Sequence, residues 1–357
     1  MEKVRLGDIF EYLPKSKLKA GDGKKTGKYK FFTSSNIQDK YVDEFIYDGE
    51  YLIFGTGGNA SINYCNEKFS TSTDNFVVKV NGNFNTKLIY LYFKNDMSKL
   101  EKGFKGASIK HISKEYINQL YIPKYDLEAQ EDIVKKLNRV QEIIDIRKKQ
   151  IEELDELIKS QFVEMFGEPT INQKGFPLEK VEDVIDFQGG SQPDKRYFEY
   201  VKTEDNIRLI QIRDYKTDDF ITYIPKKLAK RFCEEDDIMI GRYGPPIFQI
   251  LQGIKGSYNV ALMKAIPKKG NKEFIRYFLK QECLLHYLEG MSQRTAGQAG
   301  IEMPKLKKYP FPYPPIELQN RFADIVKQID KHKFEIQKSL EEMQKLQESL
   351  MNKYFGG

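Results

Sequence analysis

The sequence predicts an α+β fold: two mixed α/β domains in internal duplication, separated by two long helices that form an intramolecular antiparallel coiled coil. Three observations predict this fold class. Two stretches of about 40 residues carry a helical apolar repeat, they align at a constant offset, and the segments before them are rich in short β-branched and aromatic runs. We therefore expect domains at residues 1–126 and 169–315, and helices at residues 127–168 and 316–357.

The first long helix is predicted by a periodic apolar stripe in a stretch without helix breakers. From Leu127 to Gly167 the sequence contains no Pro, and its only Gly is the last residue. Apolar residues recur at spacings of four and three, which places them on one side of a helix about 60 Å long. Polar Arg147 and Gln161 interrupt this stripe. Its apolar positions are Ile133, Leu137, Val140, Ile144, Ile151, Leu154, Ile158 and Met165.

The second long helix repeats the pattern between Ile316 and Gly356, with Lys333 and Gln347 as polar interruptions. One amphipathic helix of this length cannot bury its stripe alone, and the nearest partner is the other copy in the same chain. We expect the two helices to pair antiparallel, with one domain near each end. The apolar positions of the second stripe are Phe322, Val326, Ile329, Ile336, Leu340, Met343, Leu350 and Tyr354.

The two helices align at an offset of 189 residues without a gap, and nine of 41 aligned positions are identical. A hydrophobic residue followed by Pro precedes both helices, and Phe-Gly closes both. Shared composition accounts for some identities but not for these common ends, so we interpret the pattern as an internal duplication. The identical pairs are Glu128/Glu317, Gln130/Gln319, Lys149/Lys338, Glu152/Glu341, Glu153/Glu342, Leu157/Leu346, Ser160/Ser349, Phe166/Phe355 and Gly167/Gly356.

The polar interruptions fall at different places in the two copies. Arg147 and Gln161 have apolar counterparts in the second helix, and Lys333 and Gln347 have apolar counterparts in the first. Such staggered polar positions either fix the register of the helix pair or lie at its exposed rim, and the sequence leaves both interpretations open.

The sequence pattern of the two remaining segments is typical of mixed α/β domains with several strands. Short runs of β-branched and aromatic residues in them are broken by Gly, Asn and Asp. The runs match loosely in the same order, for example at residues 52–58 and 238–244. Residues 167–175 are rich in turn-forming residues and link the two halves.

The net charge of +6 is unevenly distributed along the chain. Residues 1–126 carry 20 basic and 15 acidic residues, and residues 169–315 carry 24 and 19, so each domain has a net charge of +5. Residues 127–168 carry 7 and 11, and residues 316–357 carry 7 and 7, which leaves the helices at −4 and 0. Two basic domains joined by neutral or acidic helices favour a polyanionic binding partner that is contacted at two places. An ordinary lysine-rich surface is an equal alternative.

Composition excludes several classes of protein. No apolar run reaches 18 residues and the first residues form no apolar signal core, so we expect neither membrane spans nor secretion. The three cysteines are widely spaced and form no CxxC pair, which excludes a disulfide framework and a cysteine zinc site and fits a reducing cytoplasm. The three histidines lie far apart, so we expect no metal site.

Particular strings occur at matching places in the two halves. Residues 122–130, Ile-Pro-Lys-Tyr-Asp-Leu-Glu-Ala-Gln, and residues 311–319, Phe-Pro-Tyr-Pro-Pro-Ile-Glu-Leu-Gln, lead into the helices. Three further strings in the second domain, residues 188–193, 207–214 and 240–244, also belong to this comparison. These strings, together with the order domain, long helix, domain, long helix, resemble the specificity (S) subunit of type I restriction-modification systems. The resemblance covers the whole chain. Residues 15–30 depart from that family, because a lysine-rich stretch replaces its usual Gly-Gly-Thr-Pro region.

The resemblance implies a subunit that chooses a DNA site and performs no chemistry. Its two domains would be target-recognition domains, each reading one half of a split, asymmetric sequence in double-stranded DNA. The helices would act as spacer and ruler and hold two methyltransferase subunits. Those subunits carry S-adenosylmethionine and methylate adenine, while restriction subunits use ATP and Mg²⁺ to translocate and cleave DNA. The chain itself would need no cofactor and no membrane.

The sequence offers no recognisable catalytic motif. Residues 54–58, Phe-Gly-Thr-Gly-Gly, follow an apolar run, but a nucleotide-binding loop must open a helix, and the next residues are typical of a strand or loop. We therefore interpret these glycines as a tight turn. The two Pro-Pro pairs lack the polar residue before and the aromatic residue after that adenine methylation requires, and no Walker A or HExxH motif is present. We expect no catalytic residue.

The candidates for DNA contact are basic, polar or amide-bearing residues of loops. The glycine-interrupted lysines suit phosphate contact, and a solvated loop is the alternative. Residues in matching positions ahead of each helix, or after a strand, are candidates for reading bases, with ordinary loop hydrogen bonding as the alternative. The lysines are Lys15, Lys17, Lys19, Lys24, Lys25, Lys28 and Lys30, and the other candidates are Lys110, His111, Arg242, Tyr243, Arg294 and Gln298. For Arg213 and Asp214 we favour a structural ion pair.

Two other functions remain open at the level of sequence. A specificity subunit of a modification enzyme outside type I would have much the same sequence. A coiled-coil adaptor that binds acidic proteins belongs to a different class, and it would not need two duplicated α/β domains.

Overall fold

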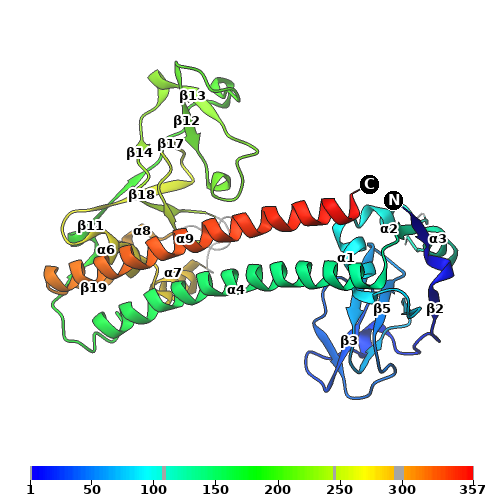
Figure 1. Cartoon of the computed structure of the whole chain (residues 1–357). Helices are drawn as coiled ribbons and strands as arrows, with labels where there is room; N and C mark the ends of the chain where they lie inside the picture. The colour runs from blue at the N-terminus through cyan, green and yellow to red at the C-terminus, as the bar shows by residue number, and fades with distance from the viewer. Residues whose placement is uncertain (1, 107–109, 244–246, 293–300, 357) are drawn as a thin grey trace. The chain divides into compact units, whose positions relative to one another are not determined.

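The computed structural model describes residues 2–106, 110–243, 247–292 and 301–356. The chain forms two compact units. The first unit consists of residues Met1–Lys149 and Gln337–Gly357, and the second of residues Gln150–Ile336. Each unit therefore contains one mixed domain together with a part of both long helices (Figure 1).

The first unit contains a four-stranded antiparallel sheet in the order β2-β8-β5-β6, a three-stranded sheet in the order β4-β3-β7, and the pair β1-β9. Helices α1 (Thr86–Asn95), α2 (Ser98–Glu101) and α3 (Lys114–Gln119) complete its domain. The strands are β1 (Lys3–Arg5), β2 (Phe10–Tyr12), β3 (Tyr29–Phe32), β4 (Lys40–Val42), β5 (Tyr51–Gly55), β6 (Ser61–Cys65), β7 (Phe69–Thr71), β8 (Asn75–Val80) and β9 (Tyr121–Pro123).

The second unit contains sheets in the orders β11-β18-β15-β16 and β13-β12-β17-β14, and the pair β10-β19. Helices α5 (Val181–Val184), α6 (Lys272–Leu279), α7 (Glu282–Ser292) and α8 (Met303–Lys308) complete its domain. The strands are β10 (Leu178–Lys180), β11 (Ile185–Gly189), β12 (Asn206–Ile210), β13 (Tyr223–Pro225), β14 (Phe232–Cys233), β15 (Ile238–Gly241), β16 (Gln249–Gln252), β17 (Gly256–Tyr258), β18 (Leu262–Pro267) and β19 (Pro310–Pro312).

The two domains have the same topology, which confirms the duplication that the helices predict. The first four-stranded sheet corresponds strand by strand to β11-β18-β15-β16, and the pair β1-β9 to β10-β19. In the second sheet of each domain the parallel pair β3-β7 corresponds to β12-β17. The structure therefore confirms the mixed α/β class and the repeated architecture.

The two long helices are α4 (Leu127–Phe166) and α9 (Ile316–Phe355). In the first unit the hydroxyl of Tyr125, which lies just before α4, donates to the carbonyl of Tyr354, near the end of α9. In the second unit the ring of Phe162 contacts that of Phe322, near the start of α9. The helices therefore run antiparallel in each unit, as the sequence predicts. All stripe positions given above are buried or half-buried.

Two of the polar interruptions have polar partners across the helix pair. Lys333 forms an ion pair with Asp155 in the second unit. In the first unit the amide of Gln347 donates to the side-chain oxygen of Gln141 at 2.8 Å. Both interruptions are half-buried. The contacts support the register interpretation at these two positions, although a partly exposed ion pair stabilises by no more than about 1 kcal/mol.

Aromatic rings join the long helices to the domain of the second unit. Phe274 of α6 lies with its ring centroid 4.6 Å from that of Phe166 and 5.7 Å from that of Phe162, both on α4. Phe166 also contacts Phe322 of α9 at 5.5 Å. In the first unit Phe355, the duplicate of Phe166, contacts Tyr92 of α1 at 5.7 Å. The same attachment is therefore used twice.

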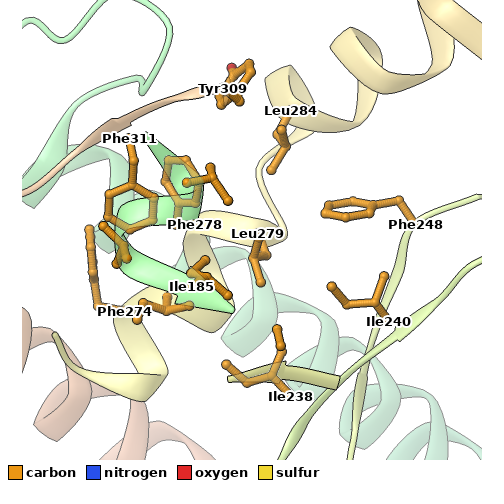
Figure 2. Packing of buried hydrophobic residues seen from close by; sticks show 14 of the residues in the cluster. Ile185, Ile238, Ile240, Phe248, Phe274, Phe278, Leu279, Leu284, Tyr309 and Phe311 are labelled. Carbon is orange, nitrogen blue, oxygen red and sulfur yellow. The ribbon is translucent and has the colours of Figure 1, made fainter. Parts of the chain in front are cut away.

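The core of the second unit extends from these helices to its main sheet. Figure 2 shows Phe274, Phe278 and Leu279 of α6 together with Ile238 and Ile240 of β15. All five side chains are no more than 1% exposed. Apolar residues in this cluster pack α6 on the face of the sheet, and the strand ends beside it carry the loops described below.

A buried glutamine ties the first domain to the beginning of its long helix. Gln130, in the first turn of α4, is 1% exposed. Its Oε1 accepts a hydrogen bond from the backbone N–H of Asn85 at 2.7 Å, and its Nε2 donates to the carbonyls of Tyr125 at 2.9 Å and Asn83 at 3.2 Å. Asn85 itself caps the N-terminus of α1. One buried side chain therefore bonds backbone groups of both the domain and the segment that leads into the helix.

The second domain repeats this arrangement. Gln319, in the first turn of α9, is 0% exposed. Its Oε1 accepts from the backbone N–H of Asn271 at 2.8 Å, and its Nε2 donates to the carbonyl of Pro314 at 2.8 Å. Asn271 caps the N-terminus of α6, as Asn85 caps α1. We call the two arrangements the glutamine clamps.

Candidate nucleic-acid interface

In the first unit, segments far apart in the sequence meet beyond the end of β5. The Nδ1 atom of His111 lies 3.1 Å from the carbonyl oxygen of Thr56, and the backbone N–H of Gly58 donates to the carbonyl of Lys110 at 3.1 Å. The backbone N–H of Thr56 also donates to the hydroxyl of Ser34 at 3.2 Å. Lys110 and His111 are exposed. The structure thus brings these two sequence candidates to the glycine turn that follows β5.

The glycine turn itself joins two antiparallel strands. Strand β5 pairs with β6 along five residues, from Tyr51↔Cys65 to Gly55↔Ser61. No helix follows the glycines, so this segment lacks the geometry of a nucleotide-binding loop. Gly58 has a φ of +83°, in the left-handed region that favours glycine. The sequence-based interpretation as a tight turn is confirmed.

Residues 33–38, after β3, form a further part of this surface that the sequence analysis missed. Asn36 holds the loop against β6: its Nδ2 donates to the carbonyl of Ala60 at 3.1 Å, and its Oδ1 accepts from the backbone N–H of Ile62 at 3.3 Å. Ile37, beside it, is 70% exposed. The cluster Thr-Ser-Ser-Asn directly after an aromatic strand was the available sequence signal.

All seven lysines of the lysine-rich stretch in the first unit are exposed, but several of them have partners. Lys24 pairs with Asp43 at 2.7 Å and Lys30 with Glu67 at 2.6 Å. Each ion pair raises the pKa of its lysine, mainly through the side-chain hydrogen bond. The ammonium groups of Lys15 and Lys28 lie 4.7 and 5.2 Å from the ring centroids of Phe76 and Tyr29.

The remaining lysines of this stretch are Lys17, Lys19 and Lys25. Among the described residues none of them has an ion-pair partner. Their charge is not neutralised by a neighbouring carboxylate, so they are the members of the stretch best suited to phosphate oxygens.

In the second unit, Arg242 and Tyr243 occupy the place that Thr56 and Gly57 have in the first, directly after the strand that corresponds to β5. The guanidinium carbon of Arg242 lies 5.2 Å from the ring centroid of Tyr243. Its Nη1 donates to the carbonyl of Val260 at 3.4 Å. Tyr243 is 39% exposed. The same place in the fold therefore carries a guanidinium group with several hydrogen-bond donors and an aromatic ring in the second domain, and two small residues in the first.

Residues 188–193, at the end of β11 and directly after it, lie against Tyr258 of β17 and the turn between β17 and β18. The hydroxyl of Tyr258 donates to Oε1 of Gln188 at 3.0 Å, and the amide of Asn259 donates to Oε1 of Gln192 at 3.4 Å. A Cβ on Gly190 would collide with the carbonyl of Asn259, so this close approach requires glycine. These polar contacts hold the segment in place.

Arg213 and Asp214 form part of a structural ion cluster. The Asp214 side chain is 1% exposed and lies 3.7 Å from Nε of Arg208 and 4.0 Å from Nε of Arg213. Burial raises the pKa of Asp214, and the two arginines oppose that shift. Arg208 also pairs with Asp218 at 2.9 Å. These contacts agree with the structural interpretation of this pair.

Arg294 and Gln298 lie outside the described residues. Among the described residues, no group of three or more His, Cys, Asp or Glu side chains could hold a metal ion. Within that same part of the chain, no helix is long and apolar enough to cross a membrane.

Comparison with known proteins places these features in a family context. The family model described as "Type I restriction modification DNA specificity domain" matches residues 1–156 and again residues 175–346. The chain is 23% identical over 402 aligned residues to the type I restriction enzyme MjaVIII specificity subunit of Methanocaldococcus jannaschii, and the alignment covers 98% of this chain and 91% of that protein.

Two solved structures share the fold. The S subunit of a type I restriction-modification system from M. genitalium superposes with a TM-score of 0.67 at 18% identity, covering 99% of this chain and 96% of the other. A structure that describes complex assembly and conformational transition of the type I R-M system gives a TM-score of 0.55 at 18% identity, covering 99% and 97%. At this level of identity both support the architecture of the chain.

Proposed function

Since the chain belongs to the family of type I restriction modification DNA specificity domains, we propose that it directs a type I restriction-modification complex to a bipartite, asymmetric site in double-stranded DNA. Each mixed domain reads one half of that site as a target-recognition domain. Partner subunits then methylate adenine within the site or restrict unmodified DNA. The chain selects the sequence, and other subunits perform the chemistry.

One observation carries the proposal: the same surface is built twice with different side chains. The turn after β5 presents Thr56 and Gly57 beside His111, while the turn after β15 presents Arg242 and Tyr243. A repeated scaffold supplies two positions on DNA, and different side chains at those positions read different bases. An asymmetric, two-part target follows from this arrangement.

The remaining parts of the complex are assigned to other chains. Two methyltransferase subunits bind along the long helices and carry S-adenosylmethionine. Restriction subunits, which join through the complex, supply ATP hydrolysis with Mg²⁺, translocation and cleavage. The net charge of +5 on each domain supports contact with DNA phosphates at both places.

The test is selection of bound duplexes from a randomised pool by the full chain together with its methyltransferase subunit. We expect a consensus of two defined halves separated by a gap of fixed length. A pool that yields no consensus, or one continuous sequence, would contradict the proposal.

Two variants sharpen this test, one in each domain. Arg242→Ala removes a guanidinium that can bond a base edge bidentately, so we expect preference at one half-site to fall by about 10- to 100-fold, which corresponds to about 1–3 kcal/mol. His111→Ala is expected to relax the other half only. Either variant that altered both halves equally would argue against one domain per half-site.

A further inference from the structure

The loop at residues 33–38 of the first unit holds a large apolar side chain out in water. Ile37 is 70% exposed, the highest value among the isoleucines that the structure describes. Scattered exposed apolar residues are common on proteins and need no explanation by themselves. Three features distinguish Ile37 from such residues: its loop is fixed, the neighbouring polar side chains are engaged, and the second domain turns the corresponding side chain inward.

The loop is fixed to the four-stranded sheet of its domain. The hydroxyl of Ser34 accepts a hydrogen bond from the backbone N–H of Thr56, directly after β5, at 3.2 Å. The side-chain amide of Asn63, a 9% exposed residue of β6, donates to the carbonyl of Ser35 at 2.8 Å. The hydroxyl of Ser35 in turn accepts from the backbone N–H of Ile37 at 3.1 Å. The backbone that carries Ile37 is therefore held in one place relative to the turn after β5.

The amide side chains on either side of Ile37 are engaged in holding the loop. The amide of Asn36 bonds two backbone groups at the start of β6 through both of its ends. The Nε2 atom of Gln38 donates to the carbonyl of Lys40 at 2.7 Å. Ile37 lies between these two residues with a side chain that forms no hydrogen bonds, so it offers a partner an apolar contact.

The second domain turns the corresponding side chain inward. Strand β12 corresponds to β3, and the two strands end at Ile210 and Phe32. Five residues later the chain carries Ile37 in the first domain and Tyr215 in the second. Tyr215 is half-buried and packs against the apolar cluster that includes Cys233 of β14. The scaffold therefore allows an inward side chain at this place, and the exposure of Ile37 is a property of the first domain's own loop.

The exposed isoleucine lies on a loop that contacts the groups assigned to DNA in the proposed function. The loop bonds Thr56, and the carbonyl oxygen of Thr56 lies 3.1 Å from Nδ1 of His111. In its major groove an undistorted duplex presents the C5-methyl of thymine as an apolar group. The stacked faces of the bases are apolar too, but a side chain reaches them only when a base step opens and the DNA kinks. The methyl group is therefore the apolar contact that requires no deformation of the DNA.

We propose that Ile37 reads the 5-methyl group of one thymine in the half-site of the first domain. The methyl group packs against the isoleucine side chain, and both lose contact with water, which favours thymine over bases that lack the methyl. The inference rests on the proposed function, because the first domain must lie in the major groove for Ile37 to reach a base. It adds an apolar contact to a surface whose other candidates act through hydrogen bonds.

The test replaces each thymine of the selected consensus by uracil, one at a time, and measures the dissociation constant of the full chain together with its methyltransferase subunit. Uracil lacks only the methyl group and keeps every hydrogen-bonding group of thymine. We expect one position at which uracil weakens binding by about 4-fold, the change that follows from burying one methyl group. Ile37→Ala should bind the thymine duplex more weakly than the original chain does, and it should bind the thymine and uracil duplexes equally at that position.

Ile46→Ala is the matched control, because Ile46 is a 46% exposed isoleucine of the same domain that lies outside the loop. This control should keep the difference between thymine and uracil. The inference is overturned if no thymine is sensitive to uracil, or if Ile37→Ala keeps the difference. It is also overturned if uracil is tolerated while the fluorescence of a neighbouring 2-aminopurine rises, which indicates a side chain inserted between bases. A chain that selects no split consensus would instead contradict the proposed function, which is a separate outcome.

Discussion

At the scale of single residues, the glutamine clamps decide how each domain is attached to its helix. Gln130 and Gln319 stood out in the sequence only as an identical pair in the duplication. Their role could not be predicted, because the groups they bind belong to Asn85 and Asn271, 45 and 48 residues away in the sequence. A polar pair in two helices is usually solvated, and only the fold shows that these side chains are buried.

The clamp predicts an unequal response to two similar substitutions. Gln130→Leu removes the hydrogen-bond partner of one backbone N–H and two backbone carbonyls at a buried side chain, so we expect it to lower the free energy of unfolding by about 2–5 kcal/mol. Gln119→Leu, at an exposed glutamine of the same unit, should change it by less than about 0.5 kcal/mol. Denaturant unfolding of both variants measures the difference, and equal effects would show that the clamp contributes little.

Asp96 makes the folding stability of the first unit depend on pH in the acidic range. Its carboxylate accepts hydrogen bonds from Lys99 and from Ser98, which lower its pKa to about 2. Because the folded pKa lies below the unfolded value, the carboxylate stabilises the fold above about pH 4, and this contribution is lost as the pH falls toward 2. Asp96→Asn should therefore lose less stability than the original chain between pH 5 and 2 in urea unfolding. Parallel curves would contradict the prediction.

At the scale of elements, helices and strands differ in how far the sequence predicts them. The long helices follow directly from local periodicity, and α4 and α9 begin and end within a few residues of the expected bounds. The strands are three to six residues long in the first unit, and their partners are distant in sequence, as β2 and β8 are. Pairing of that kind depends on the whole core, so short apolar runs indicated strands but not their order.

The long helices yield a prediction about spacing. Removing one heptad from each helix shortens the pair by about 10 Å, at 1.5 Å per residue. We expect the preferred gap between half-sites to shrink by about three base pairs, while the bases preferred in each half stay the same. Selection from randomised duplexes measures both quantities, and an unchanged gap would argue against the ruler role.

At the scale of the whole molecule, the layout of charge is more informative than its total. The domains carry +5 each and the helices −4 and 0, so a modest net charge conceals two basic bodies. The sequence named His111 as a candidate and predicted a tight turn at residues 54–58, but it did not predict that the two meet, and it missed the loop around Asn36. The residues of the candidate surface follow separate strands, and the periodicity of a sequence carries no information about which loops meet in the fold.

This layout predicts how binding responds to salt. If 6–10 phosphates are contacted, DNA affinity should fall by about 10³–10⁵ between 50 and 200 mM salt. Changing Lys17, Lys19 and Lys25 to Gln should reduce the slope of log K against log salt by about 3, without altering the preferred bases. The matched control changes three exposed lysines of the long helices, Lys135, Lys327 and Lys331, and should keep the original slope.

The residue ranges of the two units determine which unit is complete first during synthesis. The second unit is one continuous piece, residues Gln150–Ile336, but the first needs Gln337–Gly357 as well. Phe355, in that last piece, is 5% exposed in the core of the first unit. A ribosome therefore releases every residue of the second domain before it supplies the part that closes the first. We expect a premature stop near the end of the message to damage the domain encoded at its beginning.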